Sequence, residues 1–202
     1  MSPYDDALML KRALLLCLTM TACSSVKPPT SAPLTGPMSD TTWSAEEQQA
    51  VQLINELRTK GTLGGDSSVR AGTCAAQWVP TAALNTSNTA RLSADYQAQW
   101  LATYGWSAHD QPDPTFPSYV GRTVEARFTV AQRTLGTTVD WTVLMENVAA
   151  GQTTPAAAVE AWLRSPAHCA AMMHPAARHI GLSLIAGQSA AARATNWAAV
   201  LY

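Results

Sequence analysis

The sequence predicts a single α+β domain, because three segments with helical periodicity come first and two segments with strand patterns come last. The chain has 202 residues, which is enough for one domain with its own core. Hydrophobic residues make up 47% of the chain and charged residues 13%, a composition too apolar for a disordered protein. We therefore expect one folded domain in which helices and strands form separate layers.

The first predicted helix covers residues 45–60. Ser44 and Glu47 have the spacing of a capping box, in which each side chain binds the backbone amide of the other residue. Gly61 follows the helix, and a glycine at this position favours a helix end. The apolar residues that repeat at helical spacing are Val51, Ile54 and Leu57.

Two further helices and two strands are predicted along the chain. A second helix, over residues 87–104, carries alanines on one side. A third, over residues 155–164, begins at Pro155, which suits a first turn because its missing amide would have no partner there. Between these helices, residues 110–140 contain several prolines and are expected to be irregular. The predicted strands cover residues 180–186 and 196–202.

Residues 1–22 resemble the signal peptide of a bacterial lipoprotein. Two basic residues precede an apolar run over residues 13–20, and small residues then lead to Cys23. In that pattern the leader is removed and the cysteine thiol is lipidated, so we expect lipidation at Cys23. The alternative is an ordinary cleaved signal peptide with an incidental cysteine. Either Met1 or Met9 is the start of translation.

A linker is predicted after the leader. Residues 23–43 are rich in proline, serine and threonine and have no apolar periodicity, which indicates an extended and solvated segment. The folded domain is then expected to cover residues 44–202.

Several short motifs in the second half of the chain carry a family resemblance. They are Glu146-Asn147-Val148-Ala149, Trp162, Ser165-Pro166-Ala167-His168, Pro175 and Ile180-Gly181. In this order they resemble the bacterial branch of the CAP superfamily, the SCP-like extracellular or cysteine-rich secretory domains. The resemblance covers residues 45–202 and implies a three-layer α-β-α sandwich with an open cleft.

The resemblance also implies a ligand site in that cleft. Two histidines and a glutamate commonly face it in the family, and by position these residues are His109, Glu146 and His168. Imidazole nitrogens and a carboxylate suit a borderline divalent metal such as zinc, which we expect to bind weakly. The same groups could act as general acid and base. Each of them could instead be a structural residue that hydrogen-bonds to loop backbone.

Three residues near this site depart from the family pattern. Ser165 stands where many eukaryotic members have a second glutamate, and Met145 and Ala167 each replace a glycine. We expect the two glycine replacements to narrow the cleft or to change its backbone. His174 and His179 are interpreted as exposed histidines without an assigned role.

The four cysteines have different expected fates. Cys17 leaves with the leader and Cys23 is the lipidation site, so the exported domain retains Cys74 and Cys169. Some bacterial members of the family carry cysteines at these two places, and a cysteine pair outside the cytoplasm is expected to oxidise. The resemblance therefore implies a Cys74–Cys169 disulfide, and two buried free thiols are the alternative.

The charge distribution excludes nucleic acid as an expected partner, because the net charge is −1 and the 13 Lys and Arg residues are scattered. We favour an exported binding module of the cell envelope, held at the membrane by its lipid anchor. Its ligand is expected to be a divalent metal, a lipid-like molecule or a cell-wall molecule. The alternatives are a metal- or His/Glu-assisted hydrolase of peptide or cell-wall material, and a structural envelope protein with a vestigial cleft. Catalysis is the less favoured hypothesis because the sequence lacks the Gly-x-Ser-x-Gly and His-Glu-x-x-His motifs.

Overall fold

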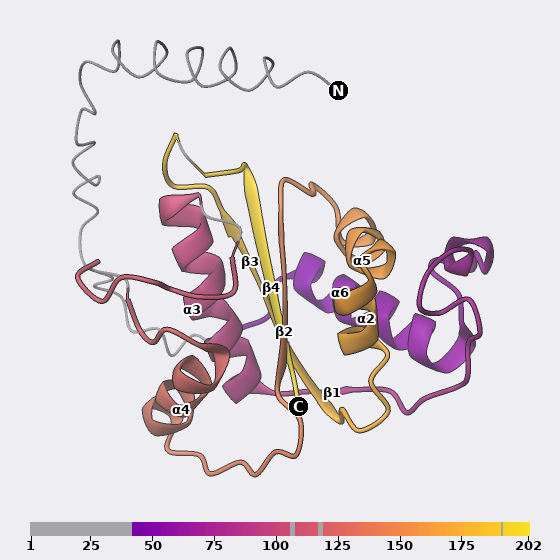
Figure 1. Cartoon of the computed structure of the whole chain (residues 1–202), viewed down its shortest axis with the longest axis horizontal. Coiled ribbons are helices and arrows are strands. Elements are labelled where there is room, and N and C mark those ends of the chain that lie inside the picture. The colour runs from indigo at the N-terminus through magenta and orange to yellow at the C-terminus, as the bar shows by residue number, and fades with distance from the viewer. Residues whose placement is uncertain (1–41, 106–107, 117–118, 191) are drawn as a thin grey trace, which may run out of the picture. The chain divides into compact units, whose positions relative to one another are not determined.

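The computed structural model describes residues 42–105, 108–116, 119–190 and 192–202. Within these ranges the chain forms five α-helices and a four-stranded sheet (Figure 1). The helices are α2 (Ala45–Lys60), α3 (Asn88–Tyr104), α4 (Val124–Leu135), α5 (Pro155–Arg164) and α6 (Pro166–Met172). The strands are β1 (Asn85–Thr86), β2 (Met145–Ala150), β3 (His179–Ala186) and β4 (Thr195–Leu201).

The sheet has the strand order β1-β3-β4-β2. β3 and β4 are antiparallel neighbours, and β2 pairs with the other side of β4, with Glu146 opposite Val200. The two residues of β1 run parallel to the start of β3. β2 is therefore an edge strand, and its outer side is available to form the wall of a cleft.

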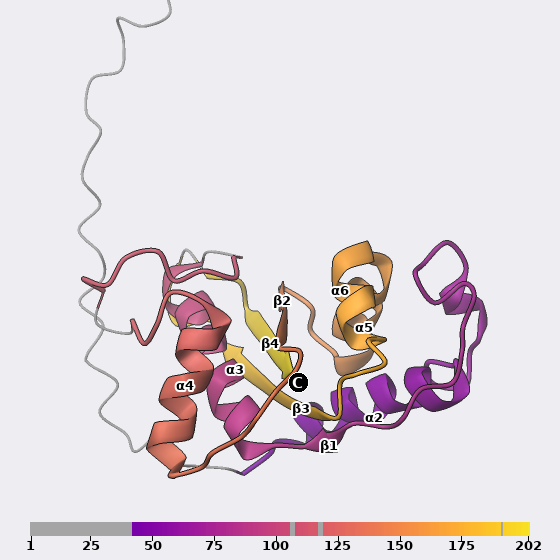
Figure 2. The same ribbon diagram turned by 60° about the horizontal axis from the view of Figure 1, so that its bottom comes forward.

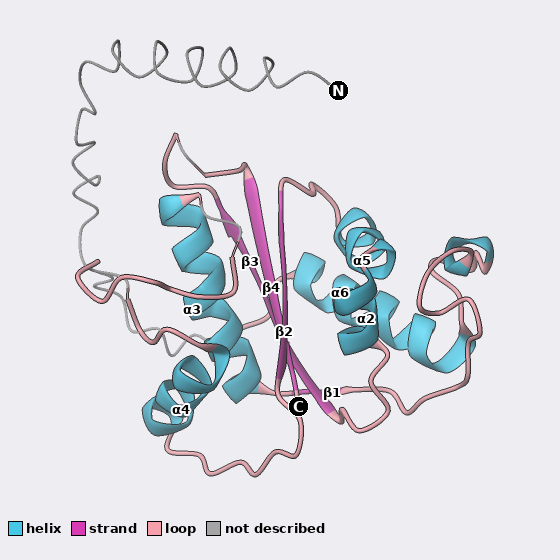
Figure 3. Ribbon diagram, in the orientation of Figure 1, coloured by secondary structure: helices cyan, strands magenta, loops and turns pink. Residues whose placement is uncertain are grey.

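Helices cover both faces of the sheet, so the domain has the expected three layers (Figures 1 and 3). α3 and α4 lie on one face, and α2, α5 and α6 lie on the other, as the turned view in Figure 2 also shows. Side chains that alternate along the strands serve both layers. In β4, Trp197, Ala199 and Leu201 join the core under α2 and α5, whereas Ala198 and Val200 join the core under α3.

Gly181 on β3 allows α3 to lie directly against the sheet. A Cβ atom at this position would overlap the backbone of Ala90 and Arg91 on α3. The side of α3 that faces the sheet is made of alanines, Ala90, Ala94 and Ala98, all fully buried. Small residues on both elements thus bring the helix close to the strand.

The helix ends follow the chemistry predicted from the sequence. Ser44 Oγ accepts a hydrogen bond from the Glu47 amide at 3.1 Å, and the Glu47 carboxylate accepts one from the Ser44 amide at 2.9 Å. Gly61 ends α2 in the left-handed conformation, with φ of 69°. The predicted helices at 45–60 and 155–164 are confirmed, and the helix predicted at 87–104 begins at Asn88, with Ser87 as its cap.

The prediction of an irregular stretch over residues 110–140 is wrong, because α4 occupies Val124–Leu135. The hydroxyl of Thr123 caps the first turn of α4, and Gly136 ends the helix. Two other elements next to the family motifs, β2 and α6, were also not predicted as secondary structure. All three of these elements border the cleft described below.

A disulfide joins Cys74 to Cys169, the pair for which the resemblance implied a bond. Cys74 lies in the loop between α2 and β1, and Cys169 lies on α6. The Cα atoms are 5.9 Å apart, a usual separation for a disulfide. The bond therefore ties α6, the helix that carries His168, to the loop that follows α2.

In the part of the chain that the structure describes, no helix is both long and apolar enough to cross a bilayer. The predicted leader (residues 1–22), the lipidation site Cys23 and nearly all of the linker lie outside the described residues.

Candidate functional site: a cleft beside the edge strand

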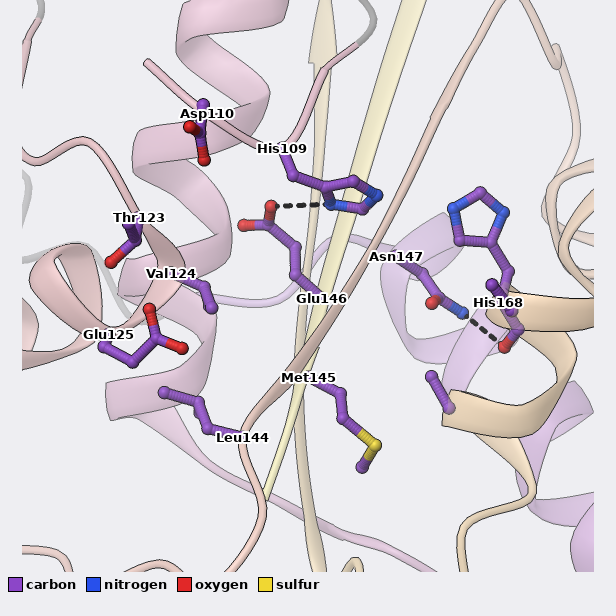
Figure 4. Close-up of a pocket in the computed structure, with 12 residues that line it drawn as sticks. His109, Asp110, Thr123, Val124, Glu125, Leu144, Met145, Glu146, Asn147 and His168 are labelled. Carbon is purple, nitrogen blue, oxygen red and sulfur yellow. Dashed lines mark hydrogen bonds and ion pairs between the residues drawn. The ribbon is translucent and has the colours of Figure 1, made fainter. Parts of the chain in front are cut away.

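A cleft of about 480 Å³ runs along the outer side of β2. One wall comes from the loop after α3 and the start of α4, and the other comes from α6 (Figure 4). The cleft brings together the three site residues predicted from the resemblance, His109, Glu146 and His168. The remaining lining residues are Asp110, Thr123, Val124, Glu125, Leu144, Met145, Asn147, Ala167 and Ala171.

Glu146 is positioned by the strand alternation of β2. Its side chain lies on the same side of the sheet as α4, where it is only 2% exposed. Nη2 of Arg127, a fully buried residue of α4, lies 2.6 Å from Glu146 Oε2. A buried carboxylate needs a positive partner or strong hydrogen bonds to offset the loss of its hydration. Arg127 supplies that partner, and no motif of the sequence marks this residue.

Arg127 also fixes the loop that carries His109. Its Nη2 donates to the carbonyl oxygen of His109 at 3.0 Å, and its Nη1 donates to the carbonyls of Gly121 and Arg122. One guanidinium therefore connects the carboxylate of β2 with both ends of the segment between α3 and α4. This planar group with several donors suits such a role better than a lysine would.

His109 lies between the cleft and the buried Glu146. Its Nδ1 is 3.1 Å from Glu146 Oε1, and its side chain is 52% exposed. An ionised carboxylate only accepts hydrogen bonds, so Nδ1 carries the hydrogen and donates it. In the neutral ring this leaves the lone pair on Nε2, the other nitrogen. Figure 4 shows the ring between Glu146 and the opposite wall.

His168 forms the opposite wall from α6. The side-chain amide of Asn147, the residue after Glu146 on β2, donates a hydrogen bond to the backbone carbonyl oxygen of His168 at 3.0 Å. Glu146 and Asn147 therefore act on opposite sides of the edge strand, one on each wall. Partial burial, and secondarily the nearby charge of His109, lower the pKa of His168 below its ordinary value of 6.5. His168 is consequently neutral at neutral pH, which is the form that can bind a metal or accept a proton.

The two imidazoles lie close enough to act on one ligand. Their ring centroids are 5.8 Å apart, with an interplanar angle of 54°. Zinc–nitrogen bonds of about 2.0–2.1 Å at a tetrahedral angle would place two such centroids roughly 5 Å apart. In the described residues no group of three or more His, Cys, Asp or Glu side chains is arranged as a metal site. The donor set that fits a metal here is the histidine pair.

The oxygens of Glu146 are both engaged, one by Arg127 and one by His109. This arrangement corresponds to a carboxylate that orients a ligating or basic imidazole from behind. Glu146 therefore lines the cleft as predicted from the resemblance, and it supports His109 through a direct contact.

Residues 51–199 match the CAP family, described as the Cysteine-rich secretory protein family. The chain belongs to this family. The matched region begins within α2 and ends within β4, so it includes every element that borders the cleft. No curated protein matches the chain in sequence.

Two solved structures resemble this CAP domain in fold. One is an extracellular protein containing a SCP domain from Bacillus anthracis str. Ames, at 18% identity and a TM-score of 0.54. That similarity covers 85% of this chain but 44% of the other, so the chain spans less than half of the Bacillus protein. The other is an outer surface protein from Borrelia burgdorferi, at 17% identity and a TM-score of 0.53, covering 79% of this chain and 94% of that one.

The residues that depart from the CAP pattern have different positions in the domain. Met145 and Ala167 line the cleft, whereas Ser165 lies at the junction of α5 and α6 and is not among the lining residues. His174 and His179 do not line the cleft either. The interpretation of these two histidines as exposed is wrong, because both are partly buried.

Proposed function

We propose that this protein is an exported binding module whose CAP domain binds a divalent metal such as zinc, weakly, between His109 and His168. The observation that carries the proposal is the pair of imidazoles on opposite walls of one cleft, 5.8 Å apart. Borderline ions such as zinc prefer imidazole nitrogen, and Nε2 of His109 has its lone pair free for this purpose. Two protein ligands leave coordination positions for water or for a further ligand from the envelope, so the ion would exchange readily.

Calorimetric titration of tag-free protein with zinc tests this proposal. Wild type is expected to bind at neutral pH, and His168→Ala is expected to bind at least about tenfold more weakly because one of two ligands is lost. Glu146→Gln is expected to weaken binding by about 10-fold or more through the lost orientation of His109. His174→Ala is the matched control, since this histidine lies outside the cleft.

The pH dependence provides a second check on the same site. Protonated imidazole cannot bind a metal, so zinc affinity is expected to fall as the pH is lowered below about 6.5. Equal affinity of wild type and His168→Ala at neutral pH would contradict the proposal and would place the metal elsewhere.

Catalysis is the second candidate, and one observation favours it. The contact between His109 Nδ1 and Glu146 is the geometry by which a carboxylate orients a general base. A hydrolase of peptide or cell-wall material would use Nε2 of His109 to accept a proton from the attacking water. Digestion of peptidoglycan and peptide substrates by wild type, with no digestion by His109→Ala, would favour this function over binding.

Export and lipid anchoring are part of the proposal. Export is supported by the extracellular and outer surface relatives of the same fold, and anchoring is supported by the lipobox-like sequence before Cys23. A membrane would then be a partner through the lipid. One acyl chain gives only marginal binding, with an association constant of about 10⁴ M⁻¹, so firm anchoring requires more than one chain.

Cell fractionation of Cys23→Ala tests the anchor. The variant is expected to leave the membrane fraction or to keep its leader, whereas Cys17→Ala is expected to behave as wild type. Membrane association of a Cys23→Ala protein processed at the normal position would contradict lipidation.

A further inference from the structure

A second pocket, of about 330 Å³, lies at the end of the sheet where β4 finishes. Three segments form it: the loop between α4 and β2, the loop between α6 and β3, and the end of the chain (Figure 1). Its lining residues, which define what we call the Trp141 pocket, are Asp140, Trp141, Thr142, Ala176, Arg178, His179 and Tyr202. None of them lines the His109–His168 cleft, so the two sites have separate walls.

Trp141 gives this pocket a flat apolar surface. Its side chain is 43% exposed, and among the described residues only Trp141 and Val79 are large hydrophobic residues with this degree of exposure. The ring of Tyr202, by contrast, packs against His179, with the two ring centroids 4.8 Å apart. An indole face left in water is suited to the apolar face of a ring-shaped ligand.

The polar groups of the pocket need partners of a particular kind. His179 Nδ1 is buried and has no hydrogen-bond partner among the described residues. Burial lowers the pKa of His179, so its ring is neutral at neutral pH and can exchange a hydrogen bond with a hydroxyl group. Asp140 adds a carboxylate that only accepts hydrogen bonds, and Thr142 adds a hydroxyl. A ligand that matches them must carry several hydroxyl groups.

The pocket lining also contains one acidic and one basic side chain, Asp140 and Arg178. Within the described part of the chain, neither Asp140 nor Arg178 takes part in an ion pair. The guanidinium of Arg178 donates from Nη1 to the carbonyls of Pro175 and Ala177, which holds it at the rim. The Arg178 guanidinium can therefore take a carboxylate group from a ligand, and a charge-assisted contact of this kind is a strong one.

We propose that the Trp141 pocket binds a pyranose ring that carries a carboxylate, an acidic sugar unit of a glycan. The apolar face of the ring would stack on Trp141, its hydroxyls would bond to Asp140 and His179, and its carboxylate would pair with Arg178. The volume is at the lower end for small-molecule sites and suits a single sugar unit. The site is independent of the metal cleft, so each proposal can fail without the other.

The experiment is an NMR titration with a matched pair of probes, methyl β-glucuronide and methyl β-glucoside, which differ by one carboxylate. The indole N–H signal of Trp141 is assigned from its absence in Trp141→Ala. The glucuronide is expected to shift this signal with saturation, and the glucoside is expected to bind about tenfold more weakly, the effect of losing one charge-assisted contact. Arg178→Ala is expected to reduce binding of the glucuronide to the level of the glucoside.

Two further variants complete the test, with binding followed through the remaining pocket signals. Trp141→Ala is expected to weaken binding of both sugars by about tenfold, whereas Val79→Ala, which removes the other exposed apolar side chain, is expected to change nothing. Equal binding of the two sugars by wild type, or unchanged binding by Trp141→Ala, would overturn the proposal. Tighter binding of adenosine monophosphate than of the glucuronide would also overturn it, because the pocket would then be a site for an aromatic base and a phosphate.

Discussion

Arg127 determines how Glu146, one of the three residues that match the family's site, can act. It is fully buried and occupies one oxygen of Glu146, while His109 occupies the other. Its remaining hydrogen bonds hold the backbone of His109 and of Arg122. Arg127 is therefore a positioning residue, and it acts on the cleft entirely through other residues.

Arg127→Met is expected to lower the free energy of unfolding by about 3–5 kcal/mol, because it leaves the Glu146 charge buried without a partner. The double variant Arg127→Met/Glu146→Gln is expected to lose less than the sum of the two single losses, since the unpaired charge is gone. Denaturant unfolding of the three variants measures both effects. Additive losses would contradict a direct interaction between the two side chains.

The stability of the domain is expected to fall as the pH drops through about 6.5. The folded state lowers the pKa of His168 and of His179, so near this pH both imidazoles bind fewer protons folded than unfolded. Protonation therefore favours the unfolded chain, and above this range both groups are neutral in both states and contribute nothing. His168→Gln removes one of the two groups and is expected to reduce the loss between about pH 8 and about pH 5, measured by urea unfolding. The same pH dependence in wild type and variant would exclude His168 as a source.

At the level of elements, α2 and α4 both carry local helix signals, but only α2 was predicted. α2 has a capping box and an apolar stripe that is complete within its own residues. α4 carries Val124, Phe128, Ala131 and Leu135 at helical spacing, but it follows a proline-containing segment that was interpreted as irregular. Burial of an arginine depends on a carboxylate 19 residues away, and no local periodicity contains that information.

Sequence information was also insufficient to predict how the site residues contact one another. Resemblance placed His109, Glu146 and His168 in one cleft, and the structure brings them together there. The resemblance could not show that Glu146 is shared between Arg127 and His109. That sharing depends on the side of β2 on which the carboxylate lies. The side is set by the pairing of β2 with β4, a contact between segments about 50 positions apart.

The close packing of α3 on β3 leads to a prediction about Gly181. Gly181→Ala places a methyl group inside the backbone of α3, so the helix must move away from the sheet. The expected cost is about 1–3 kcal/mol or more, the usual range for overpacking of a dense core. Ala186→Ser, on an exposed position of the same strand, is the control and is expected to stay within about 0.5 kcal/mol of wild type. Thermal unfolding of both variants provides the comparison, and equal midpoints would show that α3 can shift without cost.

For the whole molecule, the disulfide is expected to be a major source of stability. It closes a segment with a sequence separation of 95 residues, and a bond of this kind usually contributes about 2–4 kcal/mol. Cys74→Ser/Cys169→Ser is expected to lose this amount and to unfold at the same midpoint with or without reductant. Wild type is expected to match the double variant only when reductant is present. Denaturant unfolding under both conditions measures this, and insensitivity of wild type to reductant would contradict it.

The long-range contacts of α2 also bear on the order in which the domain can be completed. The buried carboxylate of Glu47 accepts from the Leu184 amide, 137 positions later, and buried Arg58 donates to the carbonyl of His174, 116 positions later. Before those distant segments are available, Glu47 and Arg58 lack these partners, so burial of their charges would be costly. We therefore expect α2 to pack against the rest of the domain only late in folding. The domain is therefore expected to close only after β3 and β4, which follow α2 by more than 100 positions, have been synthesised.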